Sequence, residues 1–204
     1  MSDYLNERLN KILPRLISDD FLSGSGLGNE IAFHIFEYPP EDELRVRDFL
    51  PTLLDHLPKQ KPGLKFTHVN LFDFVIDHLQ GRGYLEKALK MQREKGDQAV
   101  EKALAGMLTA DKLAAAFVDV AQPDDHDLIL ISGVGSAYPL VRTNSFLTGL
   151  HKFLGKKPLV LFYPGKFDQI TFRLFGKLRL SSTLGSTTKT GKEEHYYRAF
   201  RLVP

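Results

Sequence analysis

One glycine-rich turn has the residue types and the setting of a phosphate-binding loop. The stretch ISGVGSAYPLVRT, residues 131–143, follows the apolar run 128–131 and precedes a segment with helical spacing. In doubly wound folds such a turn holds a pyrophosphate at a helix N-terminus. Tyr138 replaces the third glycine of G-x-G-x-x-G, no lysine follows in the turn, and Arg142 is the nearest cation. An anion could bind there, but we expect the turn to shape a strand–helix junction rather than to bind a nucleotide.

Two other glycine clusters depart further from phosphate-binding patterns. In GSGLGN, residues 24–29, Asn29 stands where the third glycine belongs, and a strand-like stretch follows in place of a helix. In GSTTKTGK, residues 185–192, five residues separate the glycines where a Walker A loop has four, and Glu193 replaces the magnesium-binding Ser or Thr. We expect neither cluster to bind a nucleotide.

Other catalytic chemistry finds little support. The chain has no cysteine, and its seven histidines form no HxxxH or HExxH pair. Carboxylates cluster at 124–127 and 193–194, but in polar, turn-like runs, and no G-x-S-x-G stretch is present. The sequence therefore predicts no catalytic residue, no metal site and no cofactor.

Charge is distributed unevenly along the chain. Residues 1–149 hold 16 Lys and Arg against 22 Asp and Glu, whereas residues 150–204 hold 11 against 3. The basic last quarter either faces an acidic partner, which could be nucleic acid or protein, or neutralises the rest of the fold. The aromatic residues of FRLFGKLRL and HYYRAFR fit sheet and core better than base stacking. We expect the basic residues to remain free for an acidic partner: Lys166, Arg173, Lys177, Arg179, Arg198 and Arg201.

Apolar periodicity predicts alternating strands and helices. Pro51 removes a backbone donor inside one helix and predicts a kink or a break into two helices. A polar segment at 181–194 is predicted to be a mobile loop. Strands are expected at 30–38, 64–72, 127–132, 158–164 and 195–203, and helices at 4–17, 39–57, 72–79, 84–121 (with breaks near Gly96 and at 106–109) and 142–154.

This order predicts one α/β domain over residues 1–204, with a mostly parallel central sheet flanked by helices. The expected shape is NTPase-like or Rossmann-like, without intact phosphate-binding motifs. No stretch approaches the roughly 18 apolar residues of a membrane span. The N-terminus lacks the apolar core of a signal peptide, so we expect a cytoplasmic location and no membrane contact.

Several motifs, in combination, resemble the BrxB family of the BREX bacteriophage-exclusion systems. They are FLSGSGLGNEIAFHIFEYPPEDELRVR, NLFDFVIDHL, SGVGSAYPLVRTNSFLTGLH, PLVLFYPGKFD and YYRAFRLV, and together they cover most of the chain. The resemblance implies a small bacterial protein with no assigned enzymatic activity. It also implies that the protein acts together with an AAA-type ATPase, an alkaline-phosphatase-like protein and an adenine-specific DNA methyltransferase.

We therefore expect a non-enzymatic scaffold that binds other BREX proteins through the loops after its strands and through its basic last quarter. A nucleic-acid-binding accessory subunit is the alternative, and a nucleotide-dependent enzyme or switch using residues 133–145 is a third. The expected partner contacts are Asn29, Glu30, Tyr38, Pro39, Tyr138, Arg142, Tyr163 and Arg198.

Overall fold

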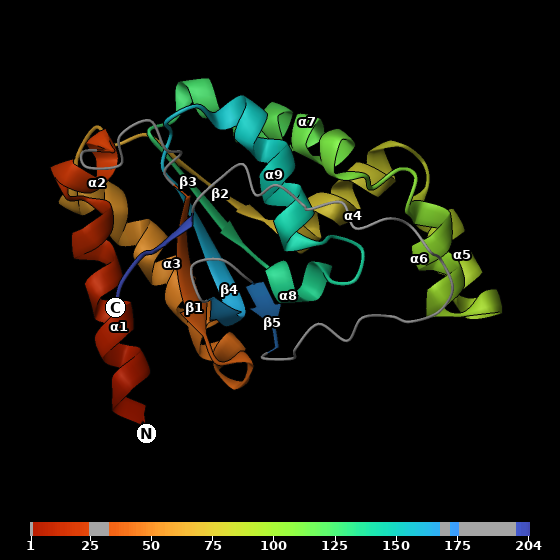
Figure 1. The fold of residues 1–204 in the computed structure, drawn as a ribbon, viewed down its shortest axis with the longest axis horizontal. Coiled ribbons are helices and arrows are strands. Elements are labelled where there is room, and N and C mark those ends of the chain that lie inside the picture. Colours follow the sequence, from red (N-terminus) through yellow and green to blue (C-terminus); the bar gives the residue numbers. More distant parts are fainter. Residues whose placement is uncertain (1, 25–32, 168–171, 176–198) are drawn as a thin grey trace, which may run out of the picture.

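A central sheet with helices on both faces forms the body of the protein (Figure 1). The computed structural model describes residues 2–24, 33–167, 172–175 and 199–204. In this part of the chain the strand order is β2-β3-β4-β1-β6, and every neighbouring pair in that order is parallel. The strands are β1 (Phe33–Tyr38), β2 (Phe66–Asn70), β3 (Leu128–Ser132), β4 (Leu159–Phe167) and β6 (Ala199–Arg201).

The end of β4 continues past the parallel sheet. Its last three residues pair antiparallel with β5 (Phe172–Leu174). The prediction of an α/β fold with a mostly parallel sheet is confirmed. Residues 181–194, predicted to be a mobile loop, lie outside the described residues.

The helices form a layer on each face of the sheet (Figure 1). One layer holds α1 (Ser2–Leu16), α2 (Asp19–Ser23) and α3 (Glu43–Gln60), the last preceded by the 3-10 turn η1 (Pro40–Asp42). The other holds α4 (Leu71–Gly81), α5 (Leu85–Lys95), α6 (Asp97–Leu104), α7 (Ala110–Ala121), α8 (Val134–Ala137) and α9 (Thr143–Leu154). The turn η2 (Pro123–Asp125) leads into β3. No helix in the described ranges is long and apolar enough to cross a membrane.

Alternation along the buried strands gives each helix layer its own core. In β3, Ile129 and Ile131 join the α4–α9 side, whereas Leu128 and Leu130 join the α1–α3 side. All five residues of β3 are buried, as a central parallel strand requires.

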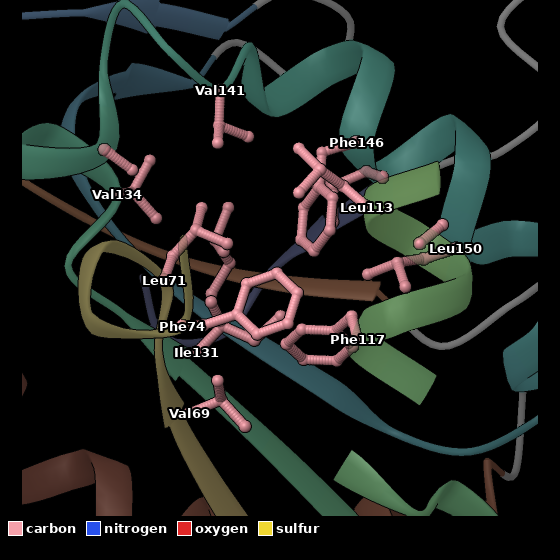
Figure 2. Close-up of a cluster of buried hydrophobic side chains, with 14 of the residues drawn as sticks. Val69, Leu71, Phe74, Leu113, Phe117, Ile131, Val134, Val141, Phe146 and Leu150 are labelled. Carbon is pink, nitrogen blue, oxygen red and sulfur yellow. The ribbon is translucent and has the colours of Figure 1, made fainter. Parts of the chain in front are cut away.

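Three phenylalanines tie the larger core together (Figure 2). The ring of Phe117 meets Phe74 at 5.6 Å and Phe146 at 5.4 Å, both nearly edge-on. These residues come from α7, α4 and α9, so one aromatic contact set joins three helices. Val134 and Val141 point into the same cluster and anchor α8 and the loop after it.

Of the two outcomes predicted at Pro51, a kink or a break, the break is absent, because α3 runs as one helix through that residue. Val46, Leu50, Leu53 and Leu57 are buried on both sides of it, so a continuous apolar stripe holds the two halves on the sheet. Pro51 itself is exposed. The helix breaks predicted near Gly96 and at 106–109 are confirmed, while the short helix α8 was not predicted.

Candidate functional site

The carboxyl ends of β1 to β4 meet at one edge of the sheet, because these strands are parallel. The chain leaves β1 for α3 on one face, and leaves β3 for α8 and α9 on the other. β4 lies between β1 and β3, so these connections leave on opposite faces on either side of β4. In open α/β sheets, ligands bind outside the carboxyl ends of the strands where the connections diverge. The turn at 131–143 lies at this edge.

Gly133 makes room for a protein side chain. Its φ is +70°, and a Cβ built on it would lie 1.9 Å from Asn70 Oδ1. That oxygen already accepts hydrogen bonds from the backbone N–H groups of Phe72 (3.0 Å) and Asp73 (3.4 Å), so it caps α4. The glycine therefore serves the close approach of the β3–α8 turn to the start of α4.

Gly135 and Gly165 serve close packing in the same way. A Cβ on Gly135 would lie 2.9 Å from Pro164 Cγ and 3.2 Å from Phe175 Cε1. A Cβ on Gly165 would lie 2.3 Å from the carbonyl oxygen of Arg173. At Gly133 and Gly135, the two glycines of the turn that resembles a phosphate-binding loop, the close contacts are therefore with protein atoms.

A chain of polar contacts links β1, α3 and α8 at the same edge. The Tyr38 hydroxyl donates to Glu43 Oε2 at 2.6 Å, Arg47 Nε donates to Glu43 Oε1 at 2.8 Å, and Arg47 Nη2 donates to Ser136 Oγ at 2.8 Å. Burial, together with the hydrogen bond to Glu43, raises the pKa of Tyr38 above its usual range. Tyr38 therefore acts as a hydrogen-bond donor and not as a proton acceptor.

Two large aromatic side chains and a cation lie exposed beside this polar chain. Tyr138 is 45% exposed and Phe175 is 40% exposed. Their rings meet edge-on at 6.3 Å, and the Arg142 guanidinium lies 6.0 Å from the centre of the Tyr138 ring. We call Tyr138, Arg142 and Phe175 the aromatic patch.

The backbone of Phe175 is unusual for a bulky residue. Its φ is +54°, a left-handed conformation. Its N–H donates to the carbonyl oxygen of Pro164 at 3.0 Å. Phe175 thus holds a bulky, exposed side chain in a backbone conformation that is rare for residues other than glycine.

The predicted partner contacts divide into exposed and buried residues. Tyr138 and Arg142 come together, and Pro39 is exposed at the end of β1. Tyr38 and Tyr163 are only 3% and 1% exposed, so their side chains shape the surface from beneath and do not touch a partner. The predicted residues that lie outside the described ranges are Asn29, Glu30, Lys177, Arg179 and Arg198.

The basic residues of the last quarter also differ from one another. Lys166 and Arg173 are direct partners in the β4–β5 ladder, and both are exposed. Arg201 is not free, because its Nη2 pairs with Glu37 Oε1 at 2.7 Å and donates to the carbonyl of Phe167 at 3.0 Å. The prediction that Arg201 remains free for an acidic partner is therefore wrong.

A serine–histidine contact escaped the sequence analysis. His68 Nε2 and Ser132 Oγ lie 2.8 Å apart, joined by the pairing of β2 with β3. Ser132 is buried, with 6% of its surface exposed, and it does not line the groove beside His68. Among residues that the structure describes, no three His, Asp or Glu side chains converge to hold a metal.

The expectation that the aromatic residues of FRLFGKLRL belong to sheet and core is wrong for Phe175, whose side chain is 40% exposed. The pairing of β5 with β4 brings it to Tyr138, and local sequence does not encode that pairing.

Comparison with known proteins places the chain in a family. The family model described as BREX protein BrxB matches residues 67–202. A BREX protein BrxB from Escherichia coli O9:H4 (strain HS) is 39% identical over 203 residues, which are 98% of this chain and 92% of that protein. Another from Bacillus cereus (strain H3081.97) is 34% identical over 203 residues, 98% of this chain and 97% of that protein. No solved structure matches. The resemblance found in the motifs is therefore confirmed, and the chain belongs to the BrxB family of BREX proteins.

Proposed function

We propose that this protein is a non-enzymatic scaffold of a BREX phage-defence system, which docks another BREX protein on the aromatic patch. The observation that carries the proposal is the exposure of Tyr138 and Phe175 beside Arg142 at the diverging edge of the sheet. Tyr, Phe and Arg are enriched at protein interfaces, and Tyr and Arg are among the residue types that contribute most of the binding energy there.

The support beneath the patch favours binding without rearrangement. The Phe175 ring packs against Gly135, and its backbone N–H donates a hydrogen bond to the carbonyl oxygen of Pro164. Val134 and Val141 anchor the turn in the larger core. A surface that is ordered before binding loses less conformational entropy when a partner arrives.

The polar groups near the patch favour a scaffold over an enzyme. Hydrogen bonds join Tyr38, Glu43, Arg47 and Ser136 into one chain. The Ser132 hydroxyl is buried and lies within hydrogen-bond distance of His68. Nucleophiles and general bases need access to a substrate, which the buried hydroxyls of Tyr38 and Ser132 lack. The hydroxyl of Ser136 is exposed and accepts a hydrogen bond from Arg47.

The partners in this proposal are the other proteins of the system. The resemblance names an alkaline-phosphatase-like protein, an AAA-type ATPase and an adenine-specific DNA methyltransferase, and a scaffold would bridge them in the cytoplasm. The aromatic patch is the first contact to test.

A pull-down of the full chain from cells that carry an intact BREX gene set tests the patch. We expect the variant Tyr138→Ala/Phe175→Ala to retain less than a tenth of the captured BREX protein, since loss of two interface anchors costs at least 1.4 kcal/mol, a factor of about 10.

The control variant, Tyr84→Ala/Phe153→Ala, removes residues that are 38% and 44% exposed elsewhere on the surface. It should capture the partner as the unchanged protein does. Equal capture by both double variants, with unchanged unfolding midpoints, would contradict docking at the patch.

A nucleic-acid-binding accessory subunit is a second candidate, favoured by the pairing of Lys166 with Arg173. The two cationic side chains lie opposite each other on the ladder and are both exposed, which suits contact with a phosphate group. This proposal uses the basic end of the sheet and not the aromatic patch.

Salt titration of duplex DNA binding separates the second candidate from the first. Each lost phosphate contact lowers the slope of log affinity against log salt by about 0.9, so Lys166→Ala/Arg173→Ala should lower it by roughly 2. The control Lys11→Ala/Lys102→Ala removes two exposed lysines elsewhere and should keep the slope. An unchanged slope in the first variant would exclude these residues from DNA contact.

A further inference from the structure

β2 lies at an edge of the sheet, and its outer side has no partner strand among the described residues. It pairs with β3 on one side only. Proteins usually protect such an edge with Pro, Lys or a bulge. The five residues of β2, FTHVN, include neither Pro nor Lys, and all but Val69 are partly exposed. The edge therefore offers backbone donors and acceptors to an added strand.

A groove of about 540 Å³ runs beside this edge, between α4 and α7. Its apolar wall includes Phe74 from α4, and Ala116 and Val120 from α7. Val120 is 57% exposed, an unusual setting for a residue of its type. The groove thus adds an apolar surface to the backbone edge.

Two aspartates, Asp73 and Asp77, also line the groove. Asp73 and Asp77 stand one turn apart on α4, both are exposed, and neither forms an ion pair with a described residue. The two histidines in the lining do not offset them, because burial lowers the pKa of both His68 and His78. Asp73 partly opposes the shift at His68, and Arg82, close to His78, adds to the shift there.

We propose that the β2 edge and this groove bind an extended, basic segment of a protein partner, which joins the sheet as a further strand. The strand edge supplies hydrogen bonds, the apolar wall packs against the aliphatic stems of Lys or Arg residues on one face of the added strand, and Asp73 and Asp77 pair with their charges. Four residues of helix rise about 6 Å, and two residues of strand span about 6.6 Å. Two Lys or Arg residues separated by one residue therefore match the spacing of the two carboxylates.

This site shares no residue with the aromatic patch. It adds a second docking surface whose partner is selected by charge and by extended conformation. The experiment can fail without any consequence for the aromatic patch, because it measures peptide binding to the isolated full chain.

Fluorescence anisotropy with three labelled peptides tests the proposal. The probes are Thr-Lys-Val-Lys-Val-Lys-Thr, the same peptide with Glu for each Lys, and the same peptide with Pro for each Val. We expect the first to bind at least tenfold more tightly than the other two. The acidic probe reverses the charge, and proline removes the N–H groups that a strand must donate.

Variants of the full chain locate the binding. Asp73→Asn/Asp77→Asn should weaken the basic probe at least tenfold. Asp124→Asn/Asp125→Asn removes the same charge from an exposed pair before β3 and should bind as the unchanged protein does. Hydrogen exchange of the backbone amides in 66–70 should slow when the basic probe binds.

The opposite results overturn the proposal. They are equal binding of the basic and acidic probes, equal binding by the two Asp variants, or protection confined to segments other than β2. Because the peptide comparison uses the unchanged protein, it decides the question even if a variant folds poorly.

Discussion

At the residue scale, Gly133 leaves no room for a side chain. Its backbone is left-handed and the Asn70 amide fills the place of a Cβ. We expect Gly133→Ala to lower the free energy of unfolding by at least about 1–3 kcal/mol, from backbone strain alone. Urea unfolding measures this loss.

Gly106→Ala is the matched control for that substitution. Gly106 has no atom within 4 Å of a built Cβ and no left-handed φ. Its substitution should change stability by less than about 1 kcal/mol, the general difference between Gly and Ala. Similar losses at the two positions would show that the contact with Asn70 is not what requires Gly133.

His34 makes folding stability depend on pH. It is 4% exposed, lies 4.7 Å from the Phe21 ring, and neither ring nitrogen has a hydrogen-bond partner among the described residues. Burial, with a smaller contribution from Arg15, lowers the pKa of His34 to about 4. The folded protein thus binds this proton less readily than the unfolded chain, where the pKa is about 6.5.

We therefore expect stability to be full above about pH 6.5 and to fall by about 3 kcal/mol as the pH drops through the folded pKa near 4. His34→Leu should reduce this loss, as urea unfolding between pH 7 and 4 would measure. The pKa values of His68 and His78 are also lowered, so part of the loss of stability with falling pH should remain in this variant. A slope unchanged by His34→Leu would contradict the burial of a neutral imidazole.

At the element scale, Glu43 joins the start of α3 to the end of β1. Its carboxylate accepts from the buried Tyr38 hydroxyl and from the half-exposed Arg47. Glu43→Ala should cost about 1–3 kcal/mol, because it leaves a buried hydroxyl without its acceptor. Arg47→Ala should cost less than about 1 kcal/mol, because its ion pair is solvated.

A double-mutant cycle checks that explanation. In Tyr38→Phe/Glu43→Ala the buried donor is gone, so the double variant should lose less stability than the sum of the single losses. Additive losses would mean that Glu43 stabilises α3 without help from Tyr38.

At the scale of the whole molecule, one sheet separates two apolar cores. Phe117 lies in the core on the α4–α9 side and Leu53 in the core on the α1–α3 side. Phe117→Ala should cost about 3–5 kcal/mol and Leu53→Ala about 2–5 kcal/mol. Since both cores use the same strands, calorimetry should show one transition that shifts in either variant, and two separate transitions would contradict a single cooperative domain.

The whole molecule also separates its charged surfaces. Lys166 and Arg173 are at the β4–β5 extension, whereas Asp73 and Asp77 line the groove at the β2 edge. A scaffold with two surfaces of opposite charge can select two different partners and reject the reverse arrangement.

Local sequence predicted much of the order of helices and strands, but it left open whether α3 is continuous through Pro51. The apolar run at 128–131 is the buried strand β3, and Gly96 separates α5 from α6 as expected. At Pro51 the sequence left a kink or a break open, and the break is absent because the buried stripe on both sides of the exposed proline keeps α3 whole. A local breaking signal was overridden by packing against the sheet.

The sequence by itself determined the alternation of strands and helices, the mostly parallel sheet and the BrxB family, because periodicity and motifs are properties of neighbouring residues. Only the tertiary structure decided that Tyr38 and Tyr163 are buried, that Arg201 is paired with Glu37, and that Phe175 meets Tyr138. Each of these depends on strands far apart in the chain, such as β1 lying between β4 and β6. The physical reason is that burial and ion pairing arise from contacts across the fold, which no local pattern specifies.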